Sequence, residues 1–284
     1  MSDLEPLEML YETDRGGEAL PLPPGLSALY GPLRIPPHPD RPYVVGNFVT
    51  SLDGVAALGE PGSAGGGPIS GRDPHDRMIM GLLRAVADAV IVGAGTQRAA
   101  NPRHLWTAEC IAPALADTYQ ALWARLGRPR SPLNVVITAR GEIDRDRRLF
   151  RSGEVPVLIV TTASGSRRLQ ELGRPPSVQV AVSEGHDRLG ARSIVDAVGN
   201  AHPSGVILVE GGPHLLGDFL AEGLLDELFL TLSPQVVGRN GSAARPGLVA
   251  GRIFAPEHPL WATPIGVKRG ESHLFLRYAF RKAG

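Results

Sequence analysis

The sequence predicts an α/β protein with a mostly parallel, twisted central sheet, helices on both faces of the sheet and an antiparallel C-terminal edge. Its short apolar runs are continuous rather than alternating, as is typical of strands that are covered on both faces. Segments with helical periodicity separate most of these runs, which favours parallel strands joined by crossovers. The last two runs have no helical segment between them, and this predicts an antiparallel pair at one edge.

The expected elements begin at residue 43. Continuously apolar runs predict strands at residues 43–50, 88–93, 133–138, 155–162, 177–182, 205–210, 226–238 and 272–280. Helical patterns lie between them at residues 74–87, 113–126, 166–172, 190–200 and 213–222. Residues 1–40 are rich in proline, so we expect an irregular N-terminal arm, followed by one folded domain at residues 41–284. The glycine-rich residues 59–71 predict a loop near or over the functional site.

Composition and charge exclude several classes of protein. The 284 residues carry 29 Lys+Arg and 29 Asp+Glu, which argues against a nucleic-acid or anionic-membrane partner. The single cysteine, Cys110, excludes an internal disulfide and a CxxC metal site, and it favours the reducing cytoplasm. No apolar run approaches the length of a membrane span, and the acidic N-terminus lacks the apolar core of a signal peptide.

Four strands deliver small, polar or charged residues at their carboxyl ends, which is where open α/β sheets bind ligands. These residues are Gly93, Gly95 and Thr96 after the second expected strand, Thr138 and Arg140 after the third, Thr161 after the fourth, and Glu210, Gly211 and Gly212 after the sixth. Glycine N–H groups and threonine hydroxyls suit phosphate oxygens. The pattern therefore predicts a phosphate-bearing cofactor that lies across the strand ends.

Each of these signals has a plainer alternative. The Gly-Ala-Gly run at 93–95 opens like a dinucleotide fingerprint, but Arg98 stands where the third glycine belongs, and a tight turn explains it equally well. Arg140 is either an ordinary loop residue or the group that holds the ribose 2′-phosphate of NADP. Glu210 either serves the site or caps the helix that follows it.

Motifs for a metal site or a hydrolase are missing from the sequence. The HExxH pair, the P-loop and the GxSxG nucleophile elbow are all absent. His75, His104 and His214 are scattered without metal-ligand spacing, so each is interpreted as a surface or helix-end histidine. We therefore expect no resident metal.

Three stretches together resemble the reductase domain of riboflavin biosynthesis, the C-terminal half of a bifunctional deaminase-reductase with a dihydrofolate-reductase-like fold. They are VVGNFVTSLDG at 44–54, LLRAVADAVIVGAGT at 82–96 and VILVEGGPHLLGDFLAEGLLDELFLTLSPQVVG at 206–238. The order of SLDG, GxGT and EGG carries the resemblance, which runs from about residue 41 to 280. The deaminase half is missing, so the chain looks like a stand-alone reductase.

The resemblance implies an NADPH-dependent reductase that converts the ribosyl group of 5-amino-6-(5-phosphoribosylamino)uracil to ribityl, and it implies a homodimer. The implied cofactor contacts are Gly93, Gly95, Thr96, Thr138, Arg140, Gly211, Gly212 and Leu215. The implied substrate-side residues are Asn47, Asp53, Arg77, Asn101 and Glu210. By the same resemblance, the Gly211–Gly212 peptide is a candidate for a cis bond, which the sequence alone does not decide.

Two departures from the family pattern fall on the substrate side. Asn47 stands where many members carry lysine, and Ala100 replaces an expected aspartate in the stretch AANPRHL. These departures motivate an alternative, an NADPH-dependent reductase of a pterin, dihydrofolate or another imine. A further alternative is a protein that binds NADPH without catalysis.

The implied mechanism is direct hydride transfer from NADPH to an imine or opened-sugar carbon. We expect Asp53 or Glu210 to hold the substrate and assist proton delivery, with partial burial raising the pKa of either. We expect Arg77 to grip a substrate phosphate. The alternatives are a turn cap for Asp53 and an exposed helix arginine for Arg77.

Overall fold

The computed structural model describes residues 4–13, 17–59, 66–128, 131–173, 175, 177–183, 189–241 and 245–280. The strands are β1 (Glu8–Glu12), β2 (Tyr43–Thr50), β3 (Ala89–Gly93), β4 (Leu133–Thr138), β5 (Val157–Thr161), β6 (Val178–Val182), β7 (Val206–Val209), β8 (Glu227–Leu232), β9 (Ala262–Gly270) and β10 (His273–Phe280). The helices are α1 (Pro24–Tyr30), α2 (Pro74–Val86), α3 (Ala94–Ala99), α4 (Ala108–Ile111), α5 (Ala116–Leu126), α6 (Arg148–Arg151), α7 (Ala163–Glu171), α8 (Ala191–Ala201) and α9 (Pro213–Ala221), with a 3-10 turn η1 (Pro113–Leu115) before α5.

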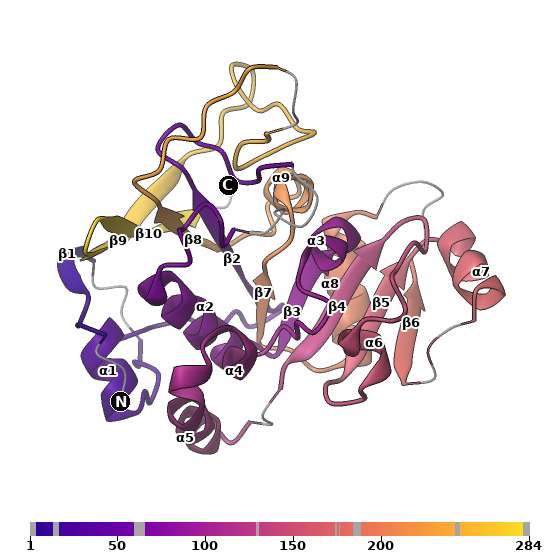
Figure 1. The fold of residues 1–284 in the computed structure, drawn as a ribbon, viewed down its shortest axis with the longest axis horizontal. Helices are drawn as coiled ribbons and strands as arrows, with labels where there is room; N and C mark the ends of the chain where they lie inside the picture. The colour runs from indigo at the N-terminus through magenta and orange to yellow at the C-terminus, as the bar shows by residue number, and fades with distance from the viewer. Residues whose placement is uncertain are drawn as a thin grey trace.

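All ten strands form one sheet in the order β1-β9-β10-β8-β2-β7-β3-β4-β5-β6 (Figure 1). Neighbours from β8 to β6 run parallel, whereas β1, β9, β10 and β8 are antiparallel. The predicted fold class, a mostly parallel sheet with an antiparallel C-terminal edge, is therefore confirmed. Every predicted strand and helix overlaps an observed one.

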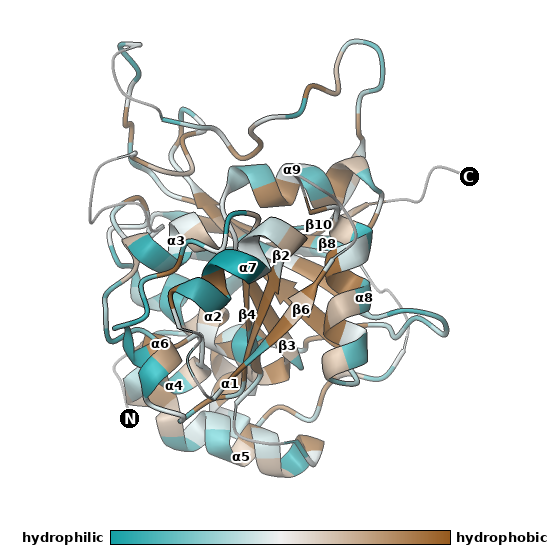
Figure 2. Cartoon of the chain, turned by 90° about the vertical axis from the view of Figure 1, so that its right-hand side faces the viewer, coloured by the Kyte–Doolittle hydropathy of each residue, from teal (hydrophilic) through white to brown (hydrophobic). Residues whose placement is uncertain are grey.

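The strands are continuously apolar because both faces of the sheet are covered. In β3, Val90 and Val92 pack into the core beneath α1, α2 and α5, while Ile91 packs into the core beneath α8 and α9. In β4, Val136 and Val135 divide in the same way. Successive side chains of a strand point to opposite faces, so two cores need an apolar residue at every position. Figure 2 shows these hydrophobic strands lying between the two helical layers.

The irregular N-terminal arm expected for residues 1–40 is wrong for two segments. Residues 8–12 form β1, which pairs antiparallel with β9. Residues 24–30 form α1, whose Leu26 and Tyr30 are 0% and 3% exposed within the core beneath α2. The prolines start α1 and shape its flanks, but they do not keep this segment outside the domain.

The antiparallel edge is larger than the sequence predicts. β8 and β10 pair antiparallel as expected. Beyond β10 lie β9 and then β1, neither of which was predicted. As a result β8 is an interior strand between β10 and β2, rather than a strand near the edge of the sheet.

Candidate active site

A cavity of about 490 Å³ lies beside β2, one face of α2, helix α3 and the end of β7. Its charged and polar lining residues are Asn47, Arg72, Asp76, Arg84, Thr96, Asn101, His104 and Glu210. The described part of the glycine-rich loop reaches it through Gly66, Gly67 and Pro68, as expected for a loop near the site. Residues 60–65 of that loop lie outside the described residues.

Glu210 is held by a buried ion pair with Arg84. Nη2 of Arg84 lies 2.7 Å from Oε2 of Glu210, and Nε lies 3.0 Å from the same oxygen. The two side chains are only 3% and 6% exposed. Asn47 donates its side-chain amide to Oε1 of Glu210 at 3.4 Å. The helix-cap alternative for Glu210 is wrong, because the N-cap of α9 is Gly212 and the carboxylate of Glu210 accepts its hydrogen bonds from Arg84 and Asn47.

His104 lies on the other side of Arg84, and its interpretation as a surface or helix-end histidine is wrong. Its Nε2 is 3.3 Å from Nη1 of Arg84, and its Nδ1 is 3.6 Å from Sγ of Cys110. Burial, followed by the charges of Arg84 and Arg77, lowers the pKa of His104 to about 3. The ring is therefore neutral near physiological pH, with Nε2 accepting from Arg84 and Nδ1 left to donate.

Two asparagines expected on the substrate side, Asn47 and Asn101, both line the large cavity. Asn47 is 9% exposed on β2, and Asn101 is exposed and accepts the backbone N–H of Arg103 at 2.8 Å. Ala100, which stands in place of the expected aspartate, also lines this cavity. The structure thus brings Asn47, Asn101 and Glu210 around one space.

A second cavity, of about 290 Å³, adjoins the first and shares Thr96 and Gly212 with it. Five of the predicted cofactor residues line it: Gly93, Gly95, Thr96, Gly212 and Leu215. A Cβ built at Gly93 or Gly95 would meet nothing within 4 Å, so the backbone at both positions borders open space. Bare backbone beside open space is what a phosphate-bearing cofactor needs for close approach.

Gly211 is required for packing between β7 and its neighbours. A Cβ at this position would overlap Cδ2 of Leu215 and lie 3.3 Å from the backbone nitrogen of Gly93. At Gly212, by contrast, the nearest atom would be Oγ1 of Thr96 at 3.7 Å. The candidate peptide bond between them is not cis, because Ala255–Pro256 is the single cis bond within the described ranges.

Of the predicted residues at the ends of β4 and β5, the two threonines are buried and hydrogen-bonded within the protein, and the arginine is exposed. Thr161 is 0% exposed and donates its hydroxyl to the carbonyl of Thr138 at 2.6 Å, so its hydroxyl supports the end of β4, and its contact with the cofactor stays a prediction. Thr138 is 6% exposed and its hydroxyl accepts the N–H of Glu142 at 3.2 Å. Arg140 is exposed directly beyond β4.

Asp53 binds the backbone of the segment after β8 and does not line the cavity. Its carboxylate accepts the hydroxyl of Ser51 at 2.6 Å and the backbone N–H groups of Val237 and Gly238 at 3.1 and 2.8 Å. The hydrogen bond from Ser51, and then that from Val237, hold the pKa of Asp53 below its usual range. The expected rise in its pKa is therefore wrong, and Asp53 is not among the cavity-lining residues.

Arg77 does not line the cavity either. Its Nε donates to the carbonyl of Ile111 at 2.9 Å, so the half-buried guanidinium ties α2 to α4 and is not an exposed helix arginine. The arginines that line the cavity are Arg84 and Arg72. Arg72 is exposed and has a φ of 58°, a left-handed conformation that costs free energy in an L-residue and is frequent at functional sites.

Asp76 is a site residue that sequence reasoning missed. It lies in the first turn of α2, 5% exposed, lines the large cavity and accepts the hydroxyl of Thr231 at 2.7 Å. In the sequence it looks like an acidic residue that favours a helix start. Within the described residues there is no group of three or more His, Cys, Asp or Glu side chains that could hold a metal ion. The described helices likewise include none long and apolar enough to cross a membrane.

A polar cavity beside strand ends, joined to a glycine-lined second cavity, is typical of an α/β enzyme domain with a phosphate-bearing cofactor. The sequence pattern of the family described as the RibD C-terminal domain matches residues 42–250. The chain therefore belongs to this family.

Two relatives of the chain carry the name of a reductase. The chain is 27% identical to the 2,5-diamino-6-ribosylamino-4(3H)-pyrimidinone 5′-phosphate reductase of Archaeoglobus fulgidus over 71% of its own length and 84% of that protein. It is 28% identical to the reductase of the same name from Methanothermobacter thermautotrophicus, over 70% and 80% of the two chains. Both carry the name of a reductase, in keeping with the resemblance.

Solved structures share the fold. A pyrimidine reductase-like protein from Corynebacterium diphtheriae superimposes with a TM-score of 0.64 at 24% identity, covering 85% of this chain and 92% of that one. A deaminase/5-amino-6-(5-phosphoribosylamino)uracil reductase from Thermotoga maritima gives a TM-score of 0.61 at 21% identity, covering 85% and 57%. The predicted fold of a pyrimidine-reductase domain is thereby confirmed.

Proposed function

We propose that the chain is an NADPH-dependent reductase of riboflavin biosynthesis. Its substrate would be a ribosylaminopyrimidine 5′-phosphate, with 5-amino-6-(5-phosphoribosylamino)uracil as the first choice, and the ribosyl group would be reduced to ribityl. The observation that carries the proposal is the junction of the two cavities at Thr96 and Gly212, directly beside the Glu210–Arg84 pair. The names of the relatives support the same reaction.

The residues at the second cavity fit a dinucleotide. Gly93 and Gly95 would let the cofactor lie against bare backbone, and Leu215 would offer an apolar contact. Arg140 would hold the ribose 2′-phosphate from its exposed position beyond β4. When bound, the reduced nicotinamide supplies a hydride. In the large cavity Glu210 and Asn47 would position the substrate, and Arg72 would reach its phosphate.

A coupled assay tests the proposal. The purified chain is mixed with NADPH and, separately, with 5-amino-6-(5-phosphoribosylamino)uracil, its 2,5-diamino-pyrimidinone counterpart and dihydrofolate. Consumption of NADPH with either pyrimidine and formation of the ribityl product support the proposed function. Consumption with dihydrofolate alone would establish the pterin-reductase alternative, and NADPH binding without turnover of any substrate would establish a non-catalytic protein.

Arg140→Ala is expected to weaken NADPH binding by about tenfold to a hundredfold, because a charge-assisted contact is worth roughly 1.5–3 kcal/mol. NADH lacks the 2′-phosphate, so its affinity should stay near the wild-type value. Titration of intrinsic fluorescence with each cofactor measures both constants. Arg151→Ala, on the exposed side of α6, serves as the matched control. An equal loss for NADPH and NADH would show that Arg140 does not read the 2′-phosphate.

Gly95→Ala is expected to stabilise the fold slightly while weakening cofactor binding. Alanine favours a helix over glycine by up to about 1 kcal/mol, and the added methyl meets no atom within 4 Å in α3. The same methyl would occupy the second cavity, so we expect at least a tenfold loss of NADPH affinity by calorimetry. Gly199→Ala in α8, which also meets nothing within 4 Å, should gain stability without affecting the cofactor. If Gly95→Ala bound NADPH as tightly as the wild type, the cofactor would not lie against α3.

A homodimer and a cytoplasmic location remain predictions. The apolar strand β8 offers no free sheet edge for a dimer, since it is interior, between β10 and β2. Exposed apolar side chains lie instead on the segment between β8 and β9, where Val236, Ile253 and Trp261 are 71%, 90% and 81% exposed.

A further inference from the structure

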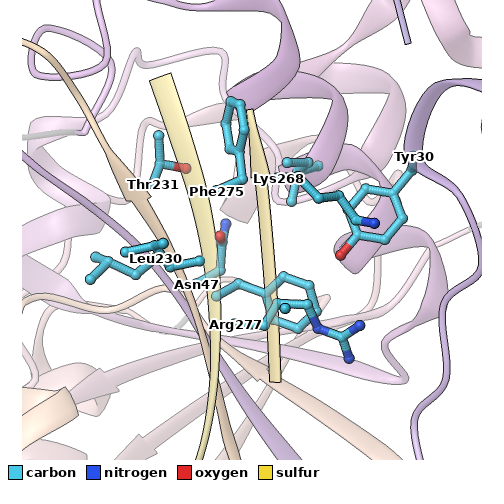
Figure 3. A pocket seen from close by; sticks show the side chains of 11 residues that line it. Tyr30, Asn47, Leu230, Thr231, Lys268, Phe275 and Arg277 are labelled. Carbon is cyan, nitrogen blue, oxygen red and sulfur yellow. The ribbon is translucent and has the colours of Figure 1, made fainter. Parts of the chain in front are cut away.

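Asp76 is a buried carboxyl group that lines the large cavity, and within the described residues no cation is hydrogen-bonded to it. It is 5% exposed and accepts a neutral hydroxyl, that of Thr231 on β8, at 2.7 Å. Thr231 in turn lines a small cavity of about 10 Å³ beneath the sheet, together with Asn47, Phe275 and Lys268 (Figure 3). The carboxyl group is thus fixed by β8 on one side and open to the substrate space on the other.

The surroundings of Asp76 raise its pKa. Burial is the largest cause, and the nearby carboxylate of Asp73 acts in the same direction. Hydrogen bonds from Thr231 and Ser70, and the charge of His273, act in the opposite direction without cancelling the burial. Ser70 and Asp73 lie directly before α2, Thr231 lies on β8, and His273 lies on β10.

The two carboxyl groups of the cavity therefore have contrasting environments. Glu210 is bound at both oxygens by the guanidinium of Arg84, whereas Asp76 has hydroxyl groups for partners. An ion-paired carboxylate binds N–H groups well but has no proton to give. A buried carboxyl group bonded to neutral hydroxyls keeps its proton more readily. When the surroundings of two carboxyl groups push their pKa values apart in this way, one can act as the acid while the other stays an anion.

We propose that Asp76 is the proton donor of the reduction, with Thr231 as its positioning residue. This rests on the proposed function. When bound, the reduced nicotinamide would supply the hydride that forms the new C–H bond at the imine carbon of the ring-opened substrate, and the C=N π pair would move to nitrogen. That nitrogen takes the proton from the carboxyl group of Asp76. The resulting carboxylate keeps the hydroxyl of Thr231, and water reprotonates it from the open cavity.

Asp76→Asn is the direct test. Removing the donor of a general acid lowers turnover by about 10²- to 10⁴-fold, and the KM for NADPH should not change. Asp117→Asn, an exposed acidic residue in the first turn of α5, is the matched control and should retain wild-type turnover. Wild-type turnover in Asp76→Asn would overturn the proposal.

The pH profile separates proton donation from a structural role. Only the protonated form is active, so kcat/KM of the wild type should fall as pH rises through the raised pKa of Asp76. Thr231→Val removes a hydrogen bond that favours the carboxylate, so the fall in kcat/KM should move to higher pH. Thr231→Ser keeps a hydroxyl and should return the fall to the pH of the wild type. Asp73→Asn removes a negative charge, so the fall should move to lower pH. A profile that none of these variants moves would overturn the assignment.

A measurement that needs no turnover distinguishes the proton-donor role of Asp76 from the proposed reductase function. The pKa of Asp76 is measured by carbon-13 NMR of the carboxyl carbons, with the resonance assigned by its loss in Asp76→Asn. A value at or below the ordinary aspartate range would overturn the proton-donor role even if the reductase is active. A raised value, with no turnover of either pyrimidine by the wild type, would instead overturn the proposed function.

Discussion

Replacing Glu210 with glutamine is expected to lower the free energy of unfolding by about 3–5 kcal/mol, because it leaves the buried guanidinium of Arg84 without its carboxylate. In thermal unfolding this corresponds to a fall in Tm of roughly 10 °C. Turnover should also fall by at least tenfold at temperatures where the variant is folded, since the anion beside Asn47 is lost. NADPH affinity should remain near normal, because Glu210 does not line the second cavity.

Two further variants separate the loss of stability from the loss of turnover. Adding Arg84→Met to Glu210→Gln removes both charges and should restore most of the lost Tm, as replacement of a whole buried pair usually does. Glu227→Gln breaks a second buried pair, with Arg277, whose side chains are 0% and 7% exposed. It should lose stability but keep turnover, since Glu227 lies outside the large cavity. Unchanged Tm in Glu210→Gln would show that the pair contributes little to the fold.

Gly165→Ala is expected to cost about 3 kcal/mol or more, because the new Cβ has no space on the first turns of α7. It would overlap Oγ1 of Thr161 and lie 2.6 Å from the carbonyl oxygen of Ala139 and 2.8 Å from the nitrogen of Gly141. Two of these atoms are backbone, so no side-chain rotation relieves the clash. The loop that carries Arg140 must therefore shift.

Denaturant unfolding measures the loss of stability in Gly165→Ala, and cofactor titration measures the second effect. We expect the preference for NADPH over NADH to shrink along with the stability, because Arg140 moves with its loop. Gly199→Ala on α8 is the control for the substitution itself. If Gly165→Ala proved as stable as the wild type, the tight contact between α7 and the end of β4 would be refuted.

The core of the fold could be predicted from the sequence because its signals are local. The strands from β2 to β7 are continuous apolar runs, and their burial on both faces follows from that pattern alone. β9 was missed because its sequence, ATPIGVKRG, contains a proline, three charged or hydroxyl residues and two glycines. β1 has only five residues and lies among prolines. β9 forms a strand because it pairs with β10 on one side and β1 on the other, and β1 forms one because it pairs with β9.

The site residues that act through their backbone could be predicted from the sequence. Those that depend on contacts with residues far away in the sequence could not. Gly93, Gly95 and Thr96 follow a strand directly, so their place at the strand ends could be inferred. Asp53 is bonded to backbone N–H groups that lie 184 and 185 residues further along the chain, and no local pattern reveals such a contact. Asp76 depends in the same way on Thr231, 155 residues away.

The pairing of β1 with β9 determines which backbone groups are exposed at this edge of the sheet. An uncovered β9 would present a row of free N–H and C=O groups to any other extended chain. β1 takes that outermost place with five residues only, and acidic residues stand at both of its ends. Glu8 pairs with Arg269 and Glu12 with Lys268. The first strand of the chain thereby closes this edge of the sheet with a short strand whose two end residues are ion-paired, which limits the length over which a further strand could add.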